Sequence, residues 1–273
     1  MLLCTPFSVL DSAFRLMIDL LRNSMIEVTS TACSRKKMHK GKVRKYYSVP
    51  TRKVTISSVQ NSCMVTNWWF PAELVTAVHL FRHRRKDLAK DHFDIDDIDS
   101  PRNGLLLFKP IEVAYDNYQL TIIKQGADYI LKIIDPGIKK TPLIDLLTDS
   151  QLENWIGSCK LESDQSNFAC LSRIYAENHD RRPGGSALKR RKTADFSKKF
   201  DFRTTFAALE GKKLVFANLN RPFNRVLNLH ARMAVIFAKQ DGIIEENEIV
   251  FDDFWSDDVD LMSKFNTLKF FES

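Results

Sequence analysis

One stretch of the chain, residues 63–123, constrains the fold more than any other. It contains an apolar run that ends at His79, a long polar loop, and an Asn103-Gly104 turn. Asn-Gly is a strong turn signal, because both residues accept the backbone angles that tight turns require. The apolar run GLLLF follows, and Pro110 suits the first turn of a short helix. The order therefore predicts two strands followed by a helix.

The polar residues of this stretch are of the types that phosphodiester hydrolysis requires. A neutral imidazole can take a proton from water near pH 7, and we assign the role of general base to His79. A divalent cation would stabilise the charge that develops on the phosphate. Glu112 and Asp116 lie four residues apart and so share one helical face, where they are candidate ligands of Mg²⁺ or another divalent cation such as Mn²⁺.

Each of these residues also has an ordinary structural explanation. A single histidine after an apolar run, as at His79, is commonly a partly buried side chain without chemistry of its own. The Glu and Asp of a short helix commonly face solvent, and Asn-Gly occurs in many turns. No one of these residues, taken alone, therefore indicates a nuclease.

The same residues resemble the motif of the HNH endonucleases. His79 ends the first strand, Asn103 opens NGLLL, and Tyr115-Asp116 stands where the family often has Phe-Asp. Glu112 lies nine residues beyond Asn103, where the family usually has its last histidine, and Val78 precedes His79 in place of a metal-binding residue. The resemblance implies a ββα-metal core that cleaves DNA with a divalent metal. It also implies that the Asn103 side chain holds the hairpin and so orients His79.

A looser likeness reaches beyond this stretch. The segments DIDSPRNGLLLFKPIEVAYDNYQLTII and PFNRVLNLHARMAVIFAK resemble the nuclease-like C-terminal domains of Crinkler effectors of oomycetes and fungi. That resemblance implies action on DNA in a nucleus, which would be a host nucleus if the protein is a secreted effector. The LFLAK-type translocation module of those effectors is not recognisable in the sequence. The alternative is an HNH protein of the producing cell.

Positive charge is concentrated in residues 34–53. The net charge is +7, and this block holds nine Lys and Arg and no acid, so the rest of the chain sums to −2. A local basic block indicates contact with DNA or an import signal, and its alternative is a solvated tail. The candidate DNA-binding residues are those of the block and of the loop after His79: Lys36, Lys37, Arg44, Lys45, Arg82, Arg84 and Arg85.

A second basic run predicts nuclear import. It consists of Lys189, Arg190, Arg191 and Lys192, and a Pro-Gly-Gly-Ser linker separates it from Arg181-Arg182. This spacing is loosely that of a bipartite nuclear-import signal. We therefore expect a nuclear protein with DNA and an import receptor as partners. The odd number of cysteines and the absence of a CxxC pair argue against a disulfide framework and a zinc staple. No apolar run is long enough to span a membrane, and the oligomeric state stays open.

The expected fold class is α+β, a ββα-metal core with additional strands and a mainly helical C-terminal region. We expect an N-terminal helix and basic arm at 1–53, the nuclease core at 54–140, and the helical region at 141–273 with a basic linker at 180–199. Additional strands are expected at 54–59 and 63–66, on either side of a turn at Gln60-Asn61-Ser62, at a hairpin around Gly126-Ala127 and at KLVFA. Further helices are expected around residues 226–237 and in a segment that ends at Gly157. Two alternatives to a nuclease remain: a DNA-binding protein whose catalytic site has decayed, and a nuclear interaction module.

Overall fold

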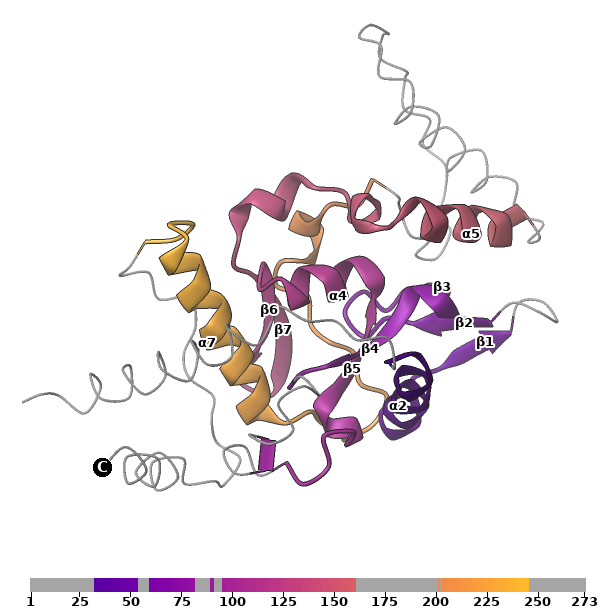
Figure 1. The fold of residues 1–273 in the computed structure, drawn as a ribbon, viewed down its shortest axis with the longest axis horizontal. Coiled ribbons are helices and arrows are strands. Elements are labelled where there is room, and N and C mark those ends of the chain that lie inside the picture. Colours follow the sequence, from indigo (N-terminus) through magenta and orange to yellow (C-terminus); the bar gives the residue numbers. More distant parts are fainter. Residues whose placement is uncertain are drawn as a thin grey trace, which may run out of the picture.

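The computed structural model describes residues 32–53, 59–81, 89–90, 95–160, 201 and 203–245, with the side chains of 32–37 and 156–160 left aside. In these ranges the chain combines helices with three small antiparallel sheets, as an α+β fold does (Figure 1). No helix in these ranges is long and apolar enough to cross a membrane. The predicted N-terminal helix and the linker at 180–199 lie outside the described residues.

The predicted order of two strands and a helix is present. Strand β4 (Val75–His79) pairs antiparallel with β5 (Gly104–Phe108), so that His79 lies opposite Gly104 and Val75 lies opposite Phe108. All residues of β5 are buried, which explains its unbroken apolar sequence. Helix α4 (Lys109–Asp116) begins directly after β5 with a proline in its first turn, as predicted.

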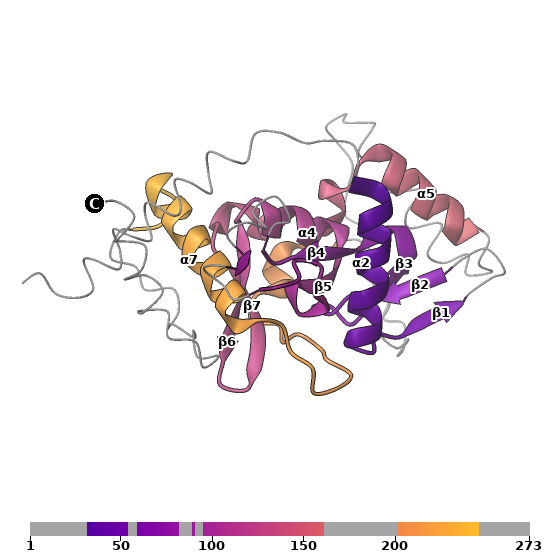
Figure 2. The same ribbon diagram turned by 60° about the horizontal axis from the view of Figure 1, so that its bottom comes forward.

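Helix α2 (Ala32–Tyr46) replaces the arm expected for the basic block. It packs against β4, β5 and the short 3-10 helix η3 (Pro101–Asn103). Figure 2 shows α2 lying across this part of the molecule. Three side chains spaced four residues apart, His39, Val43 and Tyr47, are buried, whereas Lys42, Arg44 and Lys45 are exposed. Most of the block is therefore a helix with one buried stripe and one cationic face, whereas its last three residues, Thr51–Lys53, form strand β1.

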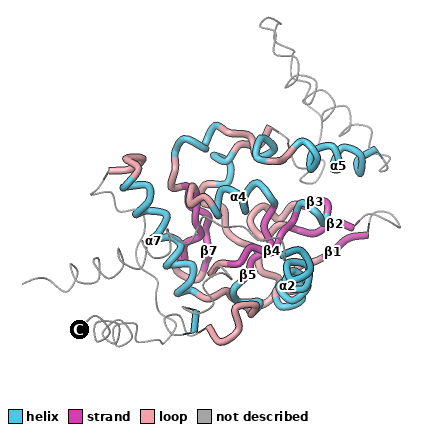
Figure 3. The backbone as a smooth tube through the Cα atoms, in the orientation of Figure 1, coloured by secondary structure: helices cyan, strands magenta, loops and turns pink. Residues whose placement is uncertain are grey.

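The faces of the β4–β5 hairpin alternate as strand geometry requires. Thr76 contacts α4, whereas His79 and Gly104, which lie on the other face, contact α2. In Figure 3 the two helices accordingly flank the hairpin. His79 therefore faces the basic helix rather than the helix that follows β5.

A second hairpin extends the core, as predicted. Strand β6 (Leu120–Gln125) pairs with β7 (Asp128–Ile133) around Gly126, whose φ of 60° favours glycine. Helix α7 (Asn224–Gln240) packs on β6, at the position where the sequence predicts a helix. His230 of α7 bonds through its ring nitrogens to the Thr121 hydroxyl and the Tyr115 carbonyl, and so joins the helix to β6 and α4.

The third sheet differs from the prediction. It consists of β1 (Thr51–Lys53), β2 (Val59–Ser62) and β3 (Trp69–Pro71), and residues 54–58 lie outside the described ranges. The turn predicted at Gln60-Asn61-Ser62 and the strand predicted at 63–66 are both wrong, because residues 59–62 form β2 and pair with β1 and β3. Asn67 has a φ of 55° and donates its N–H to the Cys63 carbonyl, which closes a tight loop and returns the chain antiparallel to β2.

The C-terminal half packs back onto the core. Its described elements are the 3-10 helices η5 (Leu143–Leu146) and η6 (Phe206–Leu209) and helices α5 (Asp149–Lys160) and α7. Helix α5 continues past Gly157, so the end predicted there is wrong. The predicted strand KLVFA forms only one bridge, from Lys213 to Ile130, although its main chain also bonds to Tyr129 and Met64. The remaining 3-10 helices are η1 (Ala72–Leu74) and η4 (Pro136–Lys140).

Gly104 allows α2 to approach β5. A Cβ at this position would lie 2.6 Å from Val43 Cγ2 and 2.7 Å from His39 Nε2, although its φ of −147° suits any residue. We expect Gly104→Ala to lower the free energy of unfolding by about 1–3 kcal/mol through overpacking, as measured by urea denaturation.

Gly41→Ala, in the same helix, is the matched control for this substitution. A Cβ at Gly41 meets no atom within 4 Å, so alanine should raise stability by about 0.5–1 kcal/mol through helix propensity. Equal effects of the two substitutions would contradict the packing of α2 against Gly104.

Candidate functional site

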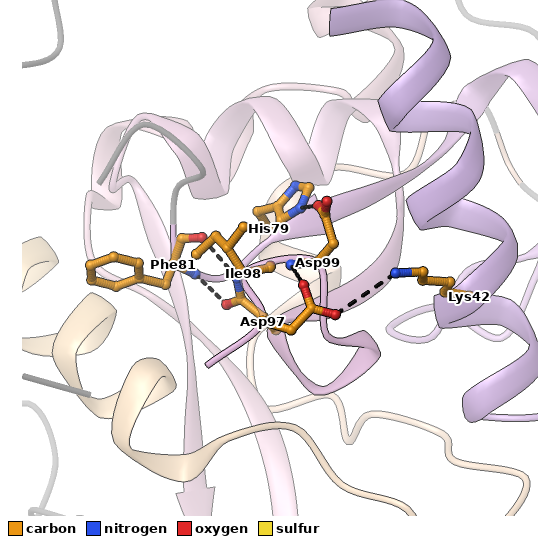
Figure 4. Close-up of polar contacts among 7 residues, drawn as sticks. Lys42, His79, Phe81, Asp97, Ile98 and Asp99 are labelled. Carbon is orange, nitrogen blue, oxygen red and sulfur yellow. Dashed lines mark hydrogen bonds and ion pairs between the residues drawn. The ribbon is translucent and has the colours of Figure 1, made fainter. Parts of the chain in front are cut away.

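Three side chains that can ligate metal meet at the end of β4. The His39 ring, from α2, stacks on the His79 ring with their centroids 3.8 Å apart and an angle of 11° between the planes. His79 Nε2 lies 3.2 Å from Asp99 Oδ1, and Figure 4 shows this contact. The ligand atoms of all three residues lie within 4.8 Å of one another. His79 and Asp99 are partly exposed, so solvent reaches the group.

Asn103 fixes the loop that carries Asp99. Its side chain is fully buried, its Oδ1 accepts from the Phe81 N–H at 2.7 Å, and its Nδ2 donates to the carbonyls of Phe81 and Ile98, each at 2.9 Å. One amide thus joins the residues just after His79 to the residue just before Asp99. These bonds have the form that the resemblance implied for Asn103, and their effect on catalysis stays a prediction.

A second set of contacts ties the loop to α2. Asp97 Oδ1 accepts from the Asp99 N–H at 2.9 Å, and Asp97 Oδ2 lies 3.8 Å from Lys42 Nζ (Figure 4). The ion pair is exposed and contributes at most about 1 kcal/mol. Its main effect is geometric, because it places the helix that carries His39 beside the loop that carries Asp99.

His39 is a buried imidazole whose surroundings keep it uncharged. Only 1% of it is exposed, and neither ring nitrogen has a hydrogen-bond partner among the described residues. Burial, with the neighbouring His79 second, lowers the pKa of His39 from 6.5 to about 4, and Asp99 only partly offsets this. His39 is therefore neutral at pH 7 and carries a lone pair on one nitrogen.

The structure does not bring the predicted metal ligand Glu112 to His79, and the other predicted ligand, Asp116, is the last residue of α4. Glu112 Oε2 accepts from the Thr76 hydroxyl at 2.7 Å and pairs with Lys109 Nζ at 2.5 Å. The register explains the separation, since α4 begins after Phe108, at the end of the hairpin opposite His79. The three residue steps from Thr76 to His79 along the strand span about 10 Å, and the two side chains face opposite ways.

The predicted DNA-binding residues are placed only in part. Arg44 and Lys45 lie exposed in the last turn of α2, and Lys36 and Lys37 belong to the same helix with side chains outside the description. The other candidates lie outside the described residues: Arg82, Arg84, Arg85, Lys189, Arg190, Arg191 and Lys192. The helix thus presents cations beside the His79 site.

Sequence reasoning missed His39 and Asp99. His39 stands in a block whose lysines and arginines suggested an arm, yet its spacing to Val43 and Tyr47 is that of a buried helical stripe. Asp99 is one of five aspartates at 91–99 in the polar loop after His79, and no motif distinguishes it from the others. Its position four residues before Asn103, which anchors the end of that loop, was the available signal.

Comparison with known proteins supports part of the resemblance. Residues 63–123 match the family model described as HNH endonuclease, a segment that includes His79, Asp99 and Asn103 but not His39. No curated protein and no solved structure matches the chain. The match indicates an HNH-like protein of nuclease type and gives no support to the Crinkler part of the resemblance.

The low pKa of His39 predicts a loss of stability in mild acid. Because the folded pKa, about 4, lies below the unfolded value, the unfolded chain binds more protons between them, and stability falls as pH decreases from about 6.5 towards 4. We expect His39 to account for a loss of about 2 kcal/mol between pH 7 and pH 5, measured by urea denaturation.

His39→Gln removes the titrating ring and keeps a polar side chain. The variant should lose correspondingly less stability between the two pH values than the unmodified protein does. An identical pH dependence of the two proteins would show that the His39 environment is not as described.

Proposed function

We propose that this protein is a metal-dependent endonuclease of the HNH type that cleaves DNA, with His79 as its general base. The observation that carries the proposal is the position of His79 within the HNH-like segment, where it ends β4 against a carboxylate in a loop held by Asn103. An imidazole beside a carboxylate and open to solvent is suited to proton transfer from water.

Asp99 would set the protonation of His79. A neutral ring that donates its Nε2 proton to Asp99 Oδ1 carries its lone pair on Nδ1, which is then the atom that takes a proton from the attacking water. The carboxylate also stabilises the imidazolium that forms when the proton is transferred. Asn103 acts through the loop and is a positioning residue for Asp99 and His79.

The divalent cation of the proposal belongs beside His79 rather than on α4. Asp99 is the carboxylate that lies against His79, and Mg²⁺ needs few protein ligands because it keeps several waters. When bound, such an ion would stabilise negative charge on the phosphate. Glu112 does not fit this role, because its contacts with Thr76 and Lys109 hold it at the other end of the strand.

The cationic face of α2 supports DNA as the substrate. Lys42, Arg44 and Lys45 are exposed on the helix whose buried stripe reaches His79, so phosphates that bind the helix lie close to the base. Lys and Arg contacts to phosphates fix position and carry no sequence information, which favours cleavage with little base specificity.

Action in the nucleus is part of the same proposal. It is supported by two basic runs, at 34–53 and 189–192, which have the composition of import signals. An import receptor is the partner that such signals recognise. A secreted effector role would rest on the Crinkler resemblance of the sequence alone.

The substitution at Glu112 favours a second candidate function. Glu112 stands where HNH proteins usually have their last histidine, and it is neutralised by Lys109. A protein with this change could bind DNA through α2 without cleaving it. Such a protein would show salt-dependent affinity for DNA and no cleavage with any metal.

Plasmid nicking by the full-length protein with Mg²⁺, Mn²⁺ or EDTA separates these functions. We expect metal-dependent nicking that falls by at least about 100-fold in His79→Ala, because a general base contributes about 10²- to 10⁴-fold. Asp99→Asn should also slow nicking, whereas DNA affinity, measured by fluorescence anisotropy, should stay unchanged in His79→Ala.

Glu112→Gln tests the location of the metal. The amide has the size of the carboxylate and can still accept from Thr76, so nicking should stay within a few-fold of the unmodified protein. Loss of nicking in Glu112→Gln, with Asp99→Asn unaffected, would return the metal site to α4. Nicking that survives His79→Ala would show that another residue is the base.

A further inference from the structure

We propose that the loop 215–222 is a second contact with duplex DNA, in which the Leu219 side chain enters the minor groove and wedges between two base pairs. This inference rests on the proposed function, because DNA is the partner in both. It adds a surface outside the HNH-like segment 63–123 and gives that surface a definite task. Helix α2 would bind the phosphate backbone while the loop bends the same duplex.

Leu219 stands at the tip of the loop. The chain bends at residues 217–219, and 92% of Leu219 is exposed, more than any other large apolar residue in the described part of the chain. Figure 2 shows the loop, in orange, projecting beside one end of α2. A single exposed leucine is ordinary on a protein surface, so the inference depends on how this loop is held and charged.

Side-chain hydrogen bonds brace the loop against the end of α2. The Tyr46 carbonyl accepts from Asn218 Nδ2 at 2.7 Å and from Asn220 Nδ2 at 2.6 Å. Asn218 Oδ1 accepts from the Asn220 N–H at 3.0 Å. Arg221 Nη1 donates to the carbonyls of Asn218 and Asn220. The residues on both sides of Leu219 are thus fixed, and a fixed tip loses little conformational entropy when it enters a groove.

The segment that carries the loop is basic throughout. Residues 211–240 contain no Asp or Glu and six basic residues: Lys212, Lys213, Arg221, Arg225, Arg232 and Lys239. Two arginines at the base of the loop lie over aromatic rings. Arg221 Cζ is 4.5 Å from the centre of the Phe216 ring, and Arg102 Cζ is 4.3 Å from that of Phe223. An apolar tip on a cationic base is complementary to a minor groove between two phosphate backbones.

The loop is tied to two elements that surround His79. At its end, the Phe223 N–H donates to the Arg102 carbonyl at 3.1 Å, directly before Asn103. Near its tip, it bonds to Tyr46, the last residue of α2. A duplex that lies along the exposed cations of α2 would therefore also meet the loop. The position of the wedge would then determine how the DNA backbone lies relative to His79.

A wedge selects DNA by the ease with which a base step deforms. Pyrimidine–purine steps are flexible and unstack readily, whereas A-tracts are stiff. The inserted leucine would therefore favour duplexes with a TA or CA/TG step and would not read the base edges. This preference is compatible with backbone contacts from α2 that carry no sequence information, because the wedge reads deformability rather than base identity.

The experiment measures DNA bending by the full-length protein in EDTA, so that cleavage does not interfere. The probe is a short duplex with a central TA step, a fluorophore at each end and a fluorescent base analogue at that step. Energy transfer should report a bend of about 20–90°, and the analogue should brighten as it unstacks. Leu219→Ala should lose both signals and bind about 3- to 10-fold more weakly, because unstacking offsets part of the leucine contact.

Two further variants separate a wedge from a general loss of apolar surface. Ile243→Ala is the matched control, since it shortens another exposed aliphatic side chain beyond the opposite end of α7, and it should bend DNA normally. Leu219→Met keeps an apolar side chain that can insert, so it should retain most of the bend. Because Leu219 is exposed, its substitutions should leave the melting temperature unchanged.

Equal bending by Leu219→Ala and the unmodified protein would overturn the wedge. Self-association of the free protein that Leu219→Ala abolishes, with bending unchanged, would assign the loop to a second copy of the chain. Bending without nicking in Mg²⁺ or Mn²⁺ would overturn the nuclease and keep the wedge, whereas nicking without bending would do the reverse. Absence of DNA binding by the unmodified protein would overturn both.

Discussion

The hydrogen bonds of the Asn103 side chain are the interaction on which the candidate site depends. The long connection between β4 and β5 could place its aspartates in many ways, yet one buried amide joins Phe81 at its start to Ile98 near its end. Asp99 follows Ile98 directly and thereby lies beside His79. Because the amide is fully buried, its loss would leave several main-chain groups without partners at about 1–3 kcal/mol each.

The register of the hairpin decides which residues can act with His79. In an antiparallel pair the start of β5 lies opposite the end of β4, so Asn103 and Asp99 meet His79 whereas α4 begins at the far end. The spacing between Asn103 and Glu112 is that of the HNH motif, but Thr76 and Lys109 hold Glu112 away from His79. The site is completed by α2, from outside the HNH-like segment.

Local patterns predicted local elements well. The helix begun by Pro110 and the hairpin at Gly126 follow from backbone preferences of single residues. The Asn103-Gly104 signal acts differently, because Gly104 is extended and Asn103 ends a 3-10 helix. The position of α2 could not be predicted this way, because the burial of His39 and Val43 depends on β5, which is distant in sequence. The strand predicted at 63–66 failed for a local reason, because Asn67 adopts a positive φ and its N–H bonds to the Cys63 carbonyl, which turns the chain. The sequence therefore concealed both a contact between distant segments and the conformation of one asparagine.

Helix α2 links two properties that the sequence presents separately. Its exposed Lys42, Arg44 and Lys45 offer charge to a phosphate backbone, and its buried His39 stacks on His79. Because His39 and Val43 pack against β5 at Gly104, the buried stripe of α2 fixes the orientation of its cationic face relative to His79. A change that moves α2 away from the hairpin would therefore alter the surroundings of His79 and the position of these cations together.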